Sequence, residues 1–189
     1  MIAIIPARGG SVRIPWKNIK LFRGKPMLAY PIEAARGSKL FDRVIVSTDS
    51  SRIAEVAYNY GAEVYERPTD DGARGTQDVA REVLEAIPTD YACVIYPCTP
   101  MLRASDLIDA CSWLRTDADT NYVMSVLTDG STVSDAGMFY FGRAEAFIED
   151  RPLYGNGVLF YSMPSGRGID INTPEDWARA ERMAWRLNV

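Results

Sequence analysis

The chain of 189 residues contains no histidine, and this absence excludes several classes of catalytic site. Ser–His and Cys–His catalysis require an imidazole base, and histidine-ligated metal sites are excluded with them. A metal ion, if the protein uses one, must be held by oxygen ligands, which favours Mg²⁺ or Mn²⁺. Cysteine is scarce as well. Cys93, Cys98 and Cys111 form no CxxC pair, so a disulfide framework is not expected.

Long hydrophobic segments are also missing. No apolar run approaches the roughly 20 residues that span a bilayer. The amino-terminal segment has neither the basic region nor the small-residue cleavage site of a signal peptide. We therefore expect a cytoplasmic protein without a membrane role. Its length and its 47% hydrophobic content predict a single globular domain.

Acidic residues are absent before Glu33, although the chain has 25 of them against 21 basic residues. The basic residues that precede Glu33 are Arg8, Arg13, Lys17, Lys20, Arg23 and Lys25. A cationic segment on an acidic chain indicates a local anion site rather than a general nucleic-acid surface. No nucleic-acid recognition motif occurs, so we expect no nucleic-acid partner.

The cationic segment begins as an apolar strand, Ile2 to Ile5, and opens at Pro6 into a loop that contains Gly9 and Gly10. The two glycines allow the backbone to turn and to bring its N–H groups close to an anion such as phosphate. The loop is neither a Walker A motif nor a GxGxxG dinucleotide fingerprint. A surface loop with solvated charges is the alternative interpretation.

Apolar strand-like runs alternate with helical patterns through the first two thirds of the chain. After the first strand, we expect strands at 43–48, 62–65, 91–96 and 122–127 and helices at 25–37, 51–60, 76–87 and 105–114. This alternation predicts an α/β fold with a doubly wound, mostly parallel sheet in three αβα layers. The final third is less regular, with strands expected at 138–141 and 158–161 and helices at 143–149 and 174–187.

Ligands of doubly wound sheets bind at the carboxyl ends of the strands. The cationic loop follows the first strand, Asp49 follows the second, and the Pro97–Arg103 turn follows the fourth. We therefore expect all three to lie along one edge of the sheet.

Five segments, in the same order and over nearly the whole chain, resemble the cytidylyltransferases that activate nine-carbon acidic sugars (the acylneuraminate cytidylyltransferase family). The segments are IIPARGGSVRIPWKNI, VIVSTDSSRIAEVAYNYGAEVYERP, YPCTPMLRASDL, DAGMFYFGRAEAF and DINTPEDWARAE. The DAG segment and the position of Tyr96 look most like the pseudaminic acid branch. The resemblance implies a single Rossmann-like nucleotidyltransferase domain over residues 1–189.

In that family the anomeric hydroxyl of the sugar acid attacks the α-phosphate of CTP, and pyrophosphate leaves. The resemblance implies catalytic roles for Arg8, Lys17 and Asp170, and a site for Mg²⁺ or Mn²⁺ at Asp170 and Asn172, which point the same way on an extended strand. Residues implied to bind the nucleotide are Ala7, Arg8, Gly9, Gly10, Ser11, Arg13, Lys17, Asn18, Asp49 and Arg74. Residues implied to bind the acidic sugar are Tyr96, Thr99, Arg103 and Asn156.

Several of these residues have structural alternatives. Asp49 precedes a predicted helix, so helix capping and a place in the site are equally compatible with its position. Thr173, Pro174 and Asp176 have the pattern of a capping box with a first-turn proline, which favours capping over catalysis for Asp176. Helix entry does not explain Asp170, and we interpret it as a metal ligand. Cys98 is best interpreted as a small filler in a turn.

The chain departs from the family pattern in three places. Val12 occupies a lysine position of the phosphate loop, and Asn172 replaces a metal-binding aspartate. The segment near 128–137 is much shorter than the family's sugar-binding and dimerisation insert, which leaves a homodimer compatible with the sequence but not indicated by it. A transferase of the same fold with another acceptor, or a catalytically weak nucleotide-binding or regulatory protein, is therefore the alternative to a nonulosonic acid cytidylyltransferase.

Overall fold

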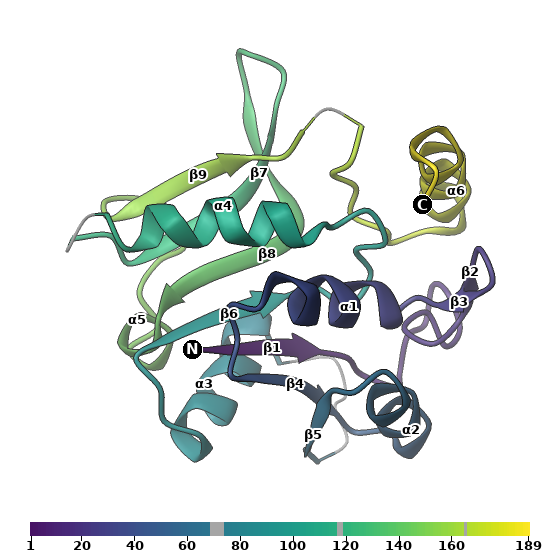
Figure 1. Cartoon of the computed structure of the whole chain (residues 1–189), viewed down its shortest axis with the longest axis horizontal. Coiled ribbons are helices and arrows are strands. Elements are labelled where there is room, and N and C mark those ends of the chain that lie inside the picture. The colour runs from purple at the N-terminus through teal and green to yellow at the C-terminus, as the bar shows by residue number, and fades with distance from the viewer. Residues whose placement is uncertain (69–73, 117–118, 165) are drawn as a thin grey trace.

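A seven-stranded sheet forms the centre of the molecule in a computed structural model that describes residues 1–68, 74–116, 119–164 and 166–189 (Figure 1). Its strand order is β5-β4-β1-β6-β8-β7-β9. The strands are β1 (Ile2–Pro6), β4 (Arg43–Thr48), β5 (Glu63–Glu66), β6 (Tyr91–Ile95), β7 (Tyr122–Thr128), β8 (Val133–Arg143) and β9 (Val158–Ser162). A separate two-stranded hairpin pairs β2 (Leu21–Phe22) with β3 (Lys25–Pro26).

The strands run in one direction with a single exception among those described. β1 pairs in parallel with β4 and β6, β4 with β5, and β7 with β9. β8 runs antiparallel between β6 and β7. The predicted mostly parallel sheet is thus confirmed. β7 has the same direction as β6, but β8 separates the two strands.

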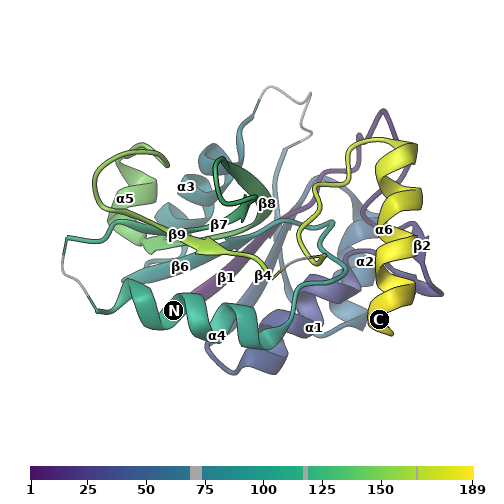
Figure 2. The ribbon, with the colours of Figure 1, turned by 90° about the horizontal axis from the view of Figure 1, so that it is seen from above.

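Helices cover both faces of the sheet, which confirms the three-layer prediction (Figure 2). One face carries α1 (Ala29–Ser38), α2 (Ser51–Asn59) and α4 (Ala104–Leu114), whose apolar residues join those of the strands in one core cluster. The other face carries α3 (Thr76–Ala86) and α5 (Ala144–Ile148). The buried apolar residues of the strands therefore pack against helices on both faces, as expected for a sheet that is covered twice.

The last helix, α6 (Pro174–Leu187), lies beside the β2–β3 hairpin rather than on a face of the sheet (Figures 1 and 2). A third apolar cluster joins α6 to the amino-terminal loop, through Trp177, Phe22 and Ile14 among others. The rings of Phe22 and Trp177 meet edge to face at 5.5 Å. This packing brings the chain that precedes α6 against the loop that follows β1.

The first helix begins later than its sequence pattern predicts. We expected a helix from Lys25–Pro26, with proline in the first turn. These residues instead pair with Leu21–Phe22, and α1 starts at Ala29. The prediction failed because the hairpin is a tertiary feature: its strand residue Phe22 is fully buried among residues of α6.

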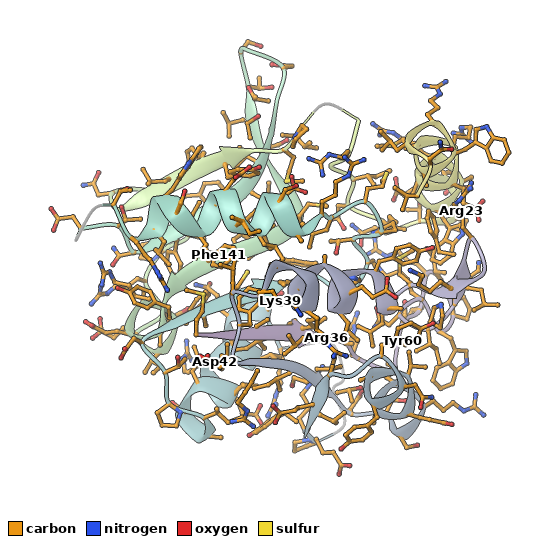
Figure 3. The ribbon with its side chains drawn as sticks, in the orientation of Figure 1. Arg23, Arg36, Lys39, Asp42, Tyr60 and Phe141 are labelled. Atoms are coloured by element: carbon orange, nitrogen blue, oxygen red, sulfur yellow. The ribbon has the colours of Figure 1, made fainter. Side chains whose placement is uncertain are left out.

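The connection after α2 requires a glycine. Arg36 of α1 donates from Nη1 to the Tyr60 carbonyl at 2.7 Å, and both residues can be followed in Figure 3. Gly61 comes next with φ of +79°, and a Cβ there would lie 1.5 Å from Arg36 Nη1. Only glycine meets both the backbone conformation and the close approach of the guanidinium.

The segment that the sequence marks as a shortened insert forms the hairpin between β7 and β8. Asp129 accepts backbone hydrogen bonds from Ser131 at 2.9 Å and Thr132 at 2.8 Å, which closes the turn. The register of the two strands shifts between Met124 and Val126, so β8 bends at the DAG residues. No helix of the described residues is long and apolar enough to cross a membrane.

Candidate active site

A cavity of about 340 Å³ opens at the carboxyl ends of the parallel strands. It lies where β1, β5 and β6 end, and the segment before α6 closes one side of it. Its walls are formed by Pro6, Arg8, Ser11, Val12, Arg13, Lys17, Asn18, Arg67, Arg74, Gly75, Thr76, Val79, Tyr96, Pro97, Cys98, Gly137, Asp170 and Asn172. The cavity thus occupies the edge at which the sequence placed the ligand.

The charge of the cavity is strongly asymmetric. Five of its lining residues are cationic, namely Arg8, Arg13, Lys17, Arg67 and Arg74. Asp170 is the one carboxylate among the residues described as lining it. Fixed positive charges in a partly enclosed space attract and hold polyanions, and several phosphates in a row are the ligand that matches five cations.

The side chain of Asn18 holds the cationic loop in place. Asn18, which is 4% exposed, donates from Nδ2 to the Arg8 carbonyl at 2.9 Å and accepts from the Cys98 thiol at 3.3 Å. The Asn18 amide thus ties the loop to the turn after β6. Since this side chain also reaches the cavity wall, its role is both to shape the loop and to line the cavity.

Asp49 has a role that neither sequence alternative described. Its Oδ1 accepts from the Gly9 backbone N–H at 2.7 Å, and Asp49 lies one residue before Ser50, the N-cap residue of α2. Asp49 does not line the cavity. The carboxylate after β4 therefore fixes the loop after β1, and the Gly9 amide is engaged within the protein rather than directed at a ligand.

The structure brings some, but not all, of the predicted nucleotide-binding residues to the cavity. Six of the predicted residues line the cavity: Arg8, Ser11, Arg13, Lys17, Asn18 and Arg74. Ala7, Gly9, Gly10 and Asp49 do not. Ala7 is fully buried, and its N–H donates to the Ser47 carbonyl at 2.9 Å, which continues the pairing of β1 with β4 by one residue.

The wall opposite the loop is the segment before α6. Lys17 Nζ donates to the Ile171 carbonyl at 2.5 Å, and Arg13 Nη2 donates to Asn172 Oδ1 at 3.2 Å. Asp170 and Asn172 do share one side of the segment, as the two-residue spacing predicts, and Asn172 Nδ2 donates to Asp170 Oδ2 at 2.5 Å. Two cations of the loop thus hold the segment that carries the predicted metal ligand.

The oxygen ligands of this wall fit one divalent cation, such as Mg²⁺, that is also bound by oxygens of a ligand. Mg²⁺ in phosphate sites is commonly held by one or two carboxylates, with water and phosphate oxygens completing its shell. Asp170 supplies one carboxylate at the cavity surface. No group of three His, Cys, Asp or Glu side chains gathers among the described residues, so an all-protein cage is absent from them.

Gly137 of the DAG segment makes the approach of Asp170 feasible. Its φ is +58°, and a Cβ at this position would lie 3.2 Å from both Cβ and Cγ of Asp170. We expect Gly137→Ala to lower the free energy of unfolding by about 1–2 kcal/mol, because of the left-handed backbone, and to displace Asp170. Urea unfolding and Mn²⁺ titration would measure the two effects. Gly130→Ala is the matched control. Gly130 also has a positive φ (94°), but a Cβ at this position would have no heavy atom within 4 Å.

The expectation that Asp176 caps a helix is confirmed. Its Oδ2 accepts from the backbone N–H of Thr173 at 2.8 Å and of Asn172 at 3.0 Å, while Thr173 Oγ1 accepts from the Asp176 N–H at 3.2 Å. The backbone donors, that of Asn172 first, lower the pKa of Asp176 below its ordinary value. This capping box fixes the start of α6 and with it the direction of the Asp170 segment.

Of the residues predicted to bind the sugar, the structure brings only Tyr96 to the cavity. Its hydroxyl accepts from Thr76 Oγ1 at 3.3 Å, and its ring lies 5.7 Å from that of Tyr140. Thr99 is fully buried, and its hydroxyl donates to the Tyr96 carbonyl at 3.0 Å. The turn between Pro97 and Pro100 therefore exposes Pro97 and Cys98 to the cavity and directs Thr99 into the core.

Arg103 and Asn156 lie outside the cavity. Arg103 is the N-cap residue of α4, its side chain is exposed, and its backbone N–H donates to Asp106 Oδ2 at 2.9 Å. Asn156 is exposed and precedes Gly157, whose carbonyl accepts from Asn121 and Tyr122 at the amino-terminal end of β7. Neither residue lines this cavity, because Arg103 belongs to a helix start and Asn156 to a loop near β7, and their role in sugar binding stays a prediction.

Sequence reasoning missed Arg67, Thr76 and Gly137. Arg67 is 7% exposed, follows β5 directly and lines the cavity. Arg67 could have been predicted from its position at the carboxyl end of a parallel strand, by the same rule that selected Asp49. Thr76 and Gly137 carried no local signal, because only the packing of α3 and the bend in β8 bring them to the cavity.

The interpretation of Cys98 as a filler predicts an inert thiol. Burial raises the pKa of Cys98 to about 12 and also raises those of Cys93 and Cys111. Thiolate is the reactive form, so we expect no cysteine of the folded protein to react readily with Ellman's reagent at pH 8 and all three to react after denaturation. Cys98→Ser is the control. A single fast thiol in the native protein that disappears in this variant would contradict the interpretation.

A family model described as cytidylyltransferase matches residues 2–136. The chain is 30% identical to a CMP-N,N'-diacetyllegionaminic acid synthase of Legionella pneumophila, over 97% of this chain and 95% of that protein. It is 32% identical to a pseudaminic acid cytidylyltransferase of Campylobacter jejuni, over 93% and 92%. It is also 36% identical to a Helicobacter pylori protein that combines a pseudaminic acid cytidylyltransferase with a hydrolase, over 84% of this chain but only 37% of that protein.

Solved structures share the fold. A CMP:2-keto-3-deoxy-manno-octonic acid synthetase in complex with CTP superposes with a TM-score of 0.82 at 17% identity, over 98% of both chains. Rv0371c of Mycobacterium tuberculosis in complex with manganese superposes with a TM-score of 0.70 at 18% identity, over 96% of this chain and 98% of that chain. At these identities the two structures establish the shared architecture, and one protein with this architecture holds a divalent metal.

Proposed function

Because the chain belongs to the cytidylyltransferase family, we propose that it transfers CMP from CTP to the anomeric hydroxyl of a nonulosonic acid, of the pseudaminic or sialic type, and releases pyrophosphate. The observation that carries this proposal is the cavity at the carboxyl edge of the sheet, whose described lining residues include five cations and one carboxylate. Relatives named for pseudaminic and legionaminic acids match nearly the full chain, which supports an acceptor of this class.

The cations would divide the triphosphate between them. Arg8, Arg13 and Lys17 come from one loop, and Arg67 and Arg74 approach from the side of β5 and α3. Transfer of a nucleotidyl group builds negative charge on the departing pyrophosphate, and cations that are already in place stabilise this charge without reorganisation. Lys17 is held against the Ile171 carbonyl, so its ammonium is oriented before a substrate arrives.

Asp170 would hold Mg²⁺ or Mn²⁺ together with phosphate oxygens of the nucleotide. When bound, such an ion would neutralise phosphate charge and polarise the phosphoryl group under attack. The contribution of the protein is to fix the Asp170 carboxylate on the cavity surface, through the α6 capping box on one side and the Gly137 turn on the other. The sugar would enter beside Tyr96, the sequence-predicted acceptor residue that lines the cavity.

The proposal is tested by measuring pyrophosphate release with CTP, Mg²⁺ or Mn²⁺, and a panel of nonulosonic acids. Turnover is expected with CTP and at least one such acid, and Arg13→Ala should lower kcat/KM by about 10²-fold because one phosphate contact is lost. Arg182→Ala removes an equal charge from an exposed position on α6 and is the matched control. Folded protein that turns over none of the acids with metal present would refute the proposed acceptor class.

A further inference from the structure

Asn172 occupies a bridging position between the cationic loop and Asp170. Its Oδ1 accepts from Arg13 Nη2 at 3.2 Å, and its Nδ2 donates to Asp170 Oδ2 at 2.5 Å. All three side chains line the cavity. One amide group thus joins the loop that follows β1 to the carboxylate that precedes α6, across 159 positions of sequence between Arg13 and Asn172.

The chemistry of the partners allows only one orientation of this amide. A guanidinium donates hydrogen bonds and never accepts them, so Arg13 must face the amide oxygen. An ionised carboxylate only accepts, so Asp170 must face the amide nitrogen. Aspartate at position 172 would retain the bond from Arg13 but would lose the donor to Asp170. Two carboxylates would then face each other at hydrogen-bond distance, a repulsion that a cation or a shared proton between them relieves.

We propose that Asn172 is a positioning residue. Its side-chain amide joins Arg13 to Asp170, so that no metal ion is needed to hold the two sides of the cavity together. It couples Arg13 to Asp170 and holds the cavity wall in its binding geometry before a divalent ion arrives. The part of this inference that concerns CTP binding rests on the proposed function. Since the Asn172 oxygen accepts from Arg13, the proposal assigns metal binding at this wall to Asp170 alone, whereas the sequence predicts both side chains as ligands.

The surroundings of Asn172 support a preformed wall. Its backbone N–H donates to Asp176 Oδ2 at 3.0 Å, and Lys17 holds the neighbouring Ile171 carbonyl. Val12, beside Arg13, is 87% exposed and brings no charge to the cavity that it lines. Neither Val12 nor Asn172 adds a charge to this wall, where Arg13 and Lys17 are the cations and Asp170 is the carboxylate among the described residues.

The inference predicts how CTP binding depends on metal. Calorimetry should give a CTP affinity of the native protein that rises less from EDTA to Mg²⁺ than the affinity of Asn172→Asp does, since the amide already does the bridging. In Asn172→Asp, affinity in EDTA should fall by about tenfold or more and should recover in Mg²⁺, because an ion relieves the repulsion between the two carboxylates. Asn172→Ala should weaken binding in both conditions. Asn59→Asp, the same change at an exposed position of α2, should behave as native.

A second arm uses Mn²⁺ alone and no nucleotide. By electron paramagnetic resonance, Asn172→Asp should bind Mn²⁺ about tenfold or more tightly than the native protein and Asn59→Asp, because it presents two carboxylates instead of one. Equal Mn²⁺ affinities, or undiminished CTP binding of Asn172→Asp in EDTA, would overturn the inference. If the native protein binds no CTP in either condition, the proposed function fails, and the Mn²⁺ arm still decides the role of Asn172.

Discussion

Asp170→Asn is expected to lower kcat by about 10²–10³-fold while leaving the protein folded, an effect of the size seen when one electrostatic contact of a transition state is removed. Asp170 is the single carboxylate among the described residues that line the cavity. The isosteric amide still presents an oxygen to Asn172 Nδ2, so the wall keeps its shape and loses only the negative charge. Steady-state kinetics with CTP, Mg²⁺ and an accepted sugar acid would measure the loss.

Asp176→Asn is the matched control, since it neutralises a carboxylate only six positions along the chain. Asp176 accepts backbone hydrogen bonds at the start of α6 and does not line the cavity. We expect this variant to lose about 1 kcal/mol of stability, as for other N-terminal caps, and to keep kcat within a few-fold of native. Equal losses of kcat in both variants would show that the charge of Asp170 has no special role.

The buried ion pair between Arg167 and Asp106 is expected to have the largest effect on stability. Arg167 Nη1 and Nη2 donate to the two carboxylate oxygens of Asp106 at 2.6 Å each, and the residues are 8% and 1% exposed. Arg167→Met leaves the Asp106 carboxylate buried without its guanidinium and should lower the free energy of unfolding by about 3–5 kcal/mol. Denaturant unfolding monitored by tryptophan fluorescence would measure this.

Two further variants make the measurement specific to the buried pair. The double variant Asp106→Asn with Arg167→Met removes both charges and should recover much of the loss, because no unpaired charge remains. Arg43 and Glu63 form a similar two-pronged pair at the surface. Arg43→Ala should cost less than about 1 kcal/mol. An Arg167→Met effect no larger than that of Arg43→Ala would contradict the prediction.

The Arg167–Asp106 pair also bears on the site. Arg167 lies three residues before Asp170, and Asp106 lies in the first turn of α4. The pair therefore anchors the start of the segment that carries Asp170 to a helix on the face of the sheet, while the capping box anchors its end to α6. A variant that loosens Arg167 without unfolding the protein should weaken Mn²⁺ binding, as other supporting contacts of metal ligands do.

Local patterns in the sequence were sufficient for the repeating part of the fold. The strands at β1, β4, β5, β6 and β7 lie where the apolar runs predicted them, and α6 spans the residues that its capping box and periodicity indicated. The rule that ligands collect at the carboxyl ends of parallel strands placed the cationic loop correctly beside Asp49 and the turn that begins at Pro97. These inferences succeed because each depends on neighbours within one or two turns of chain.

What the sequence by itself determined about this protein is therefore its α/β alternation, its cationic loop and the identity of Asp170 as the acidic group of the site. Only the tertiary structure decided that β8 separates β6 from β7, that Asp49 holds Gly9, and that Asn172 bridges Arg13 and Asp170. The physical reason is that strand order and side-chain bridges join residues far apart in sequence. Their geometry is set by how the sheet, the hairpin and α6 pack together, and no local pattern records it.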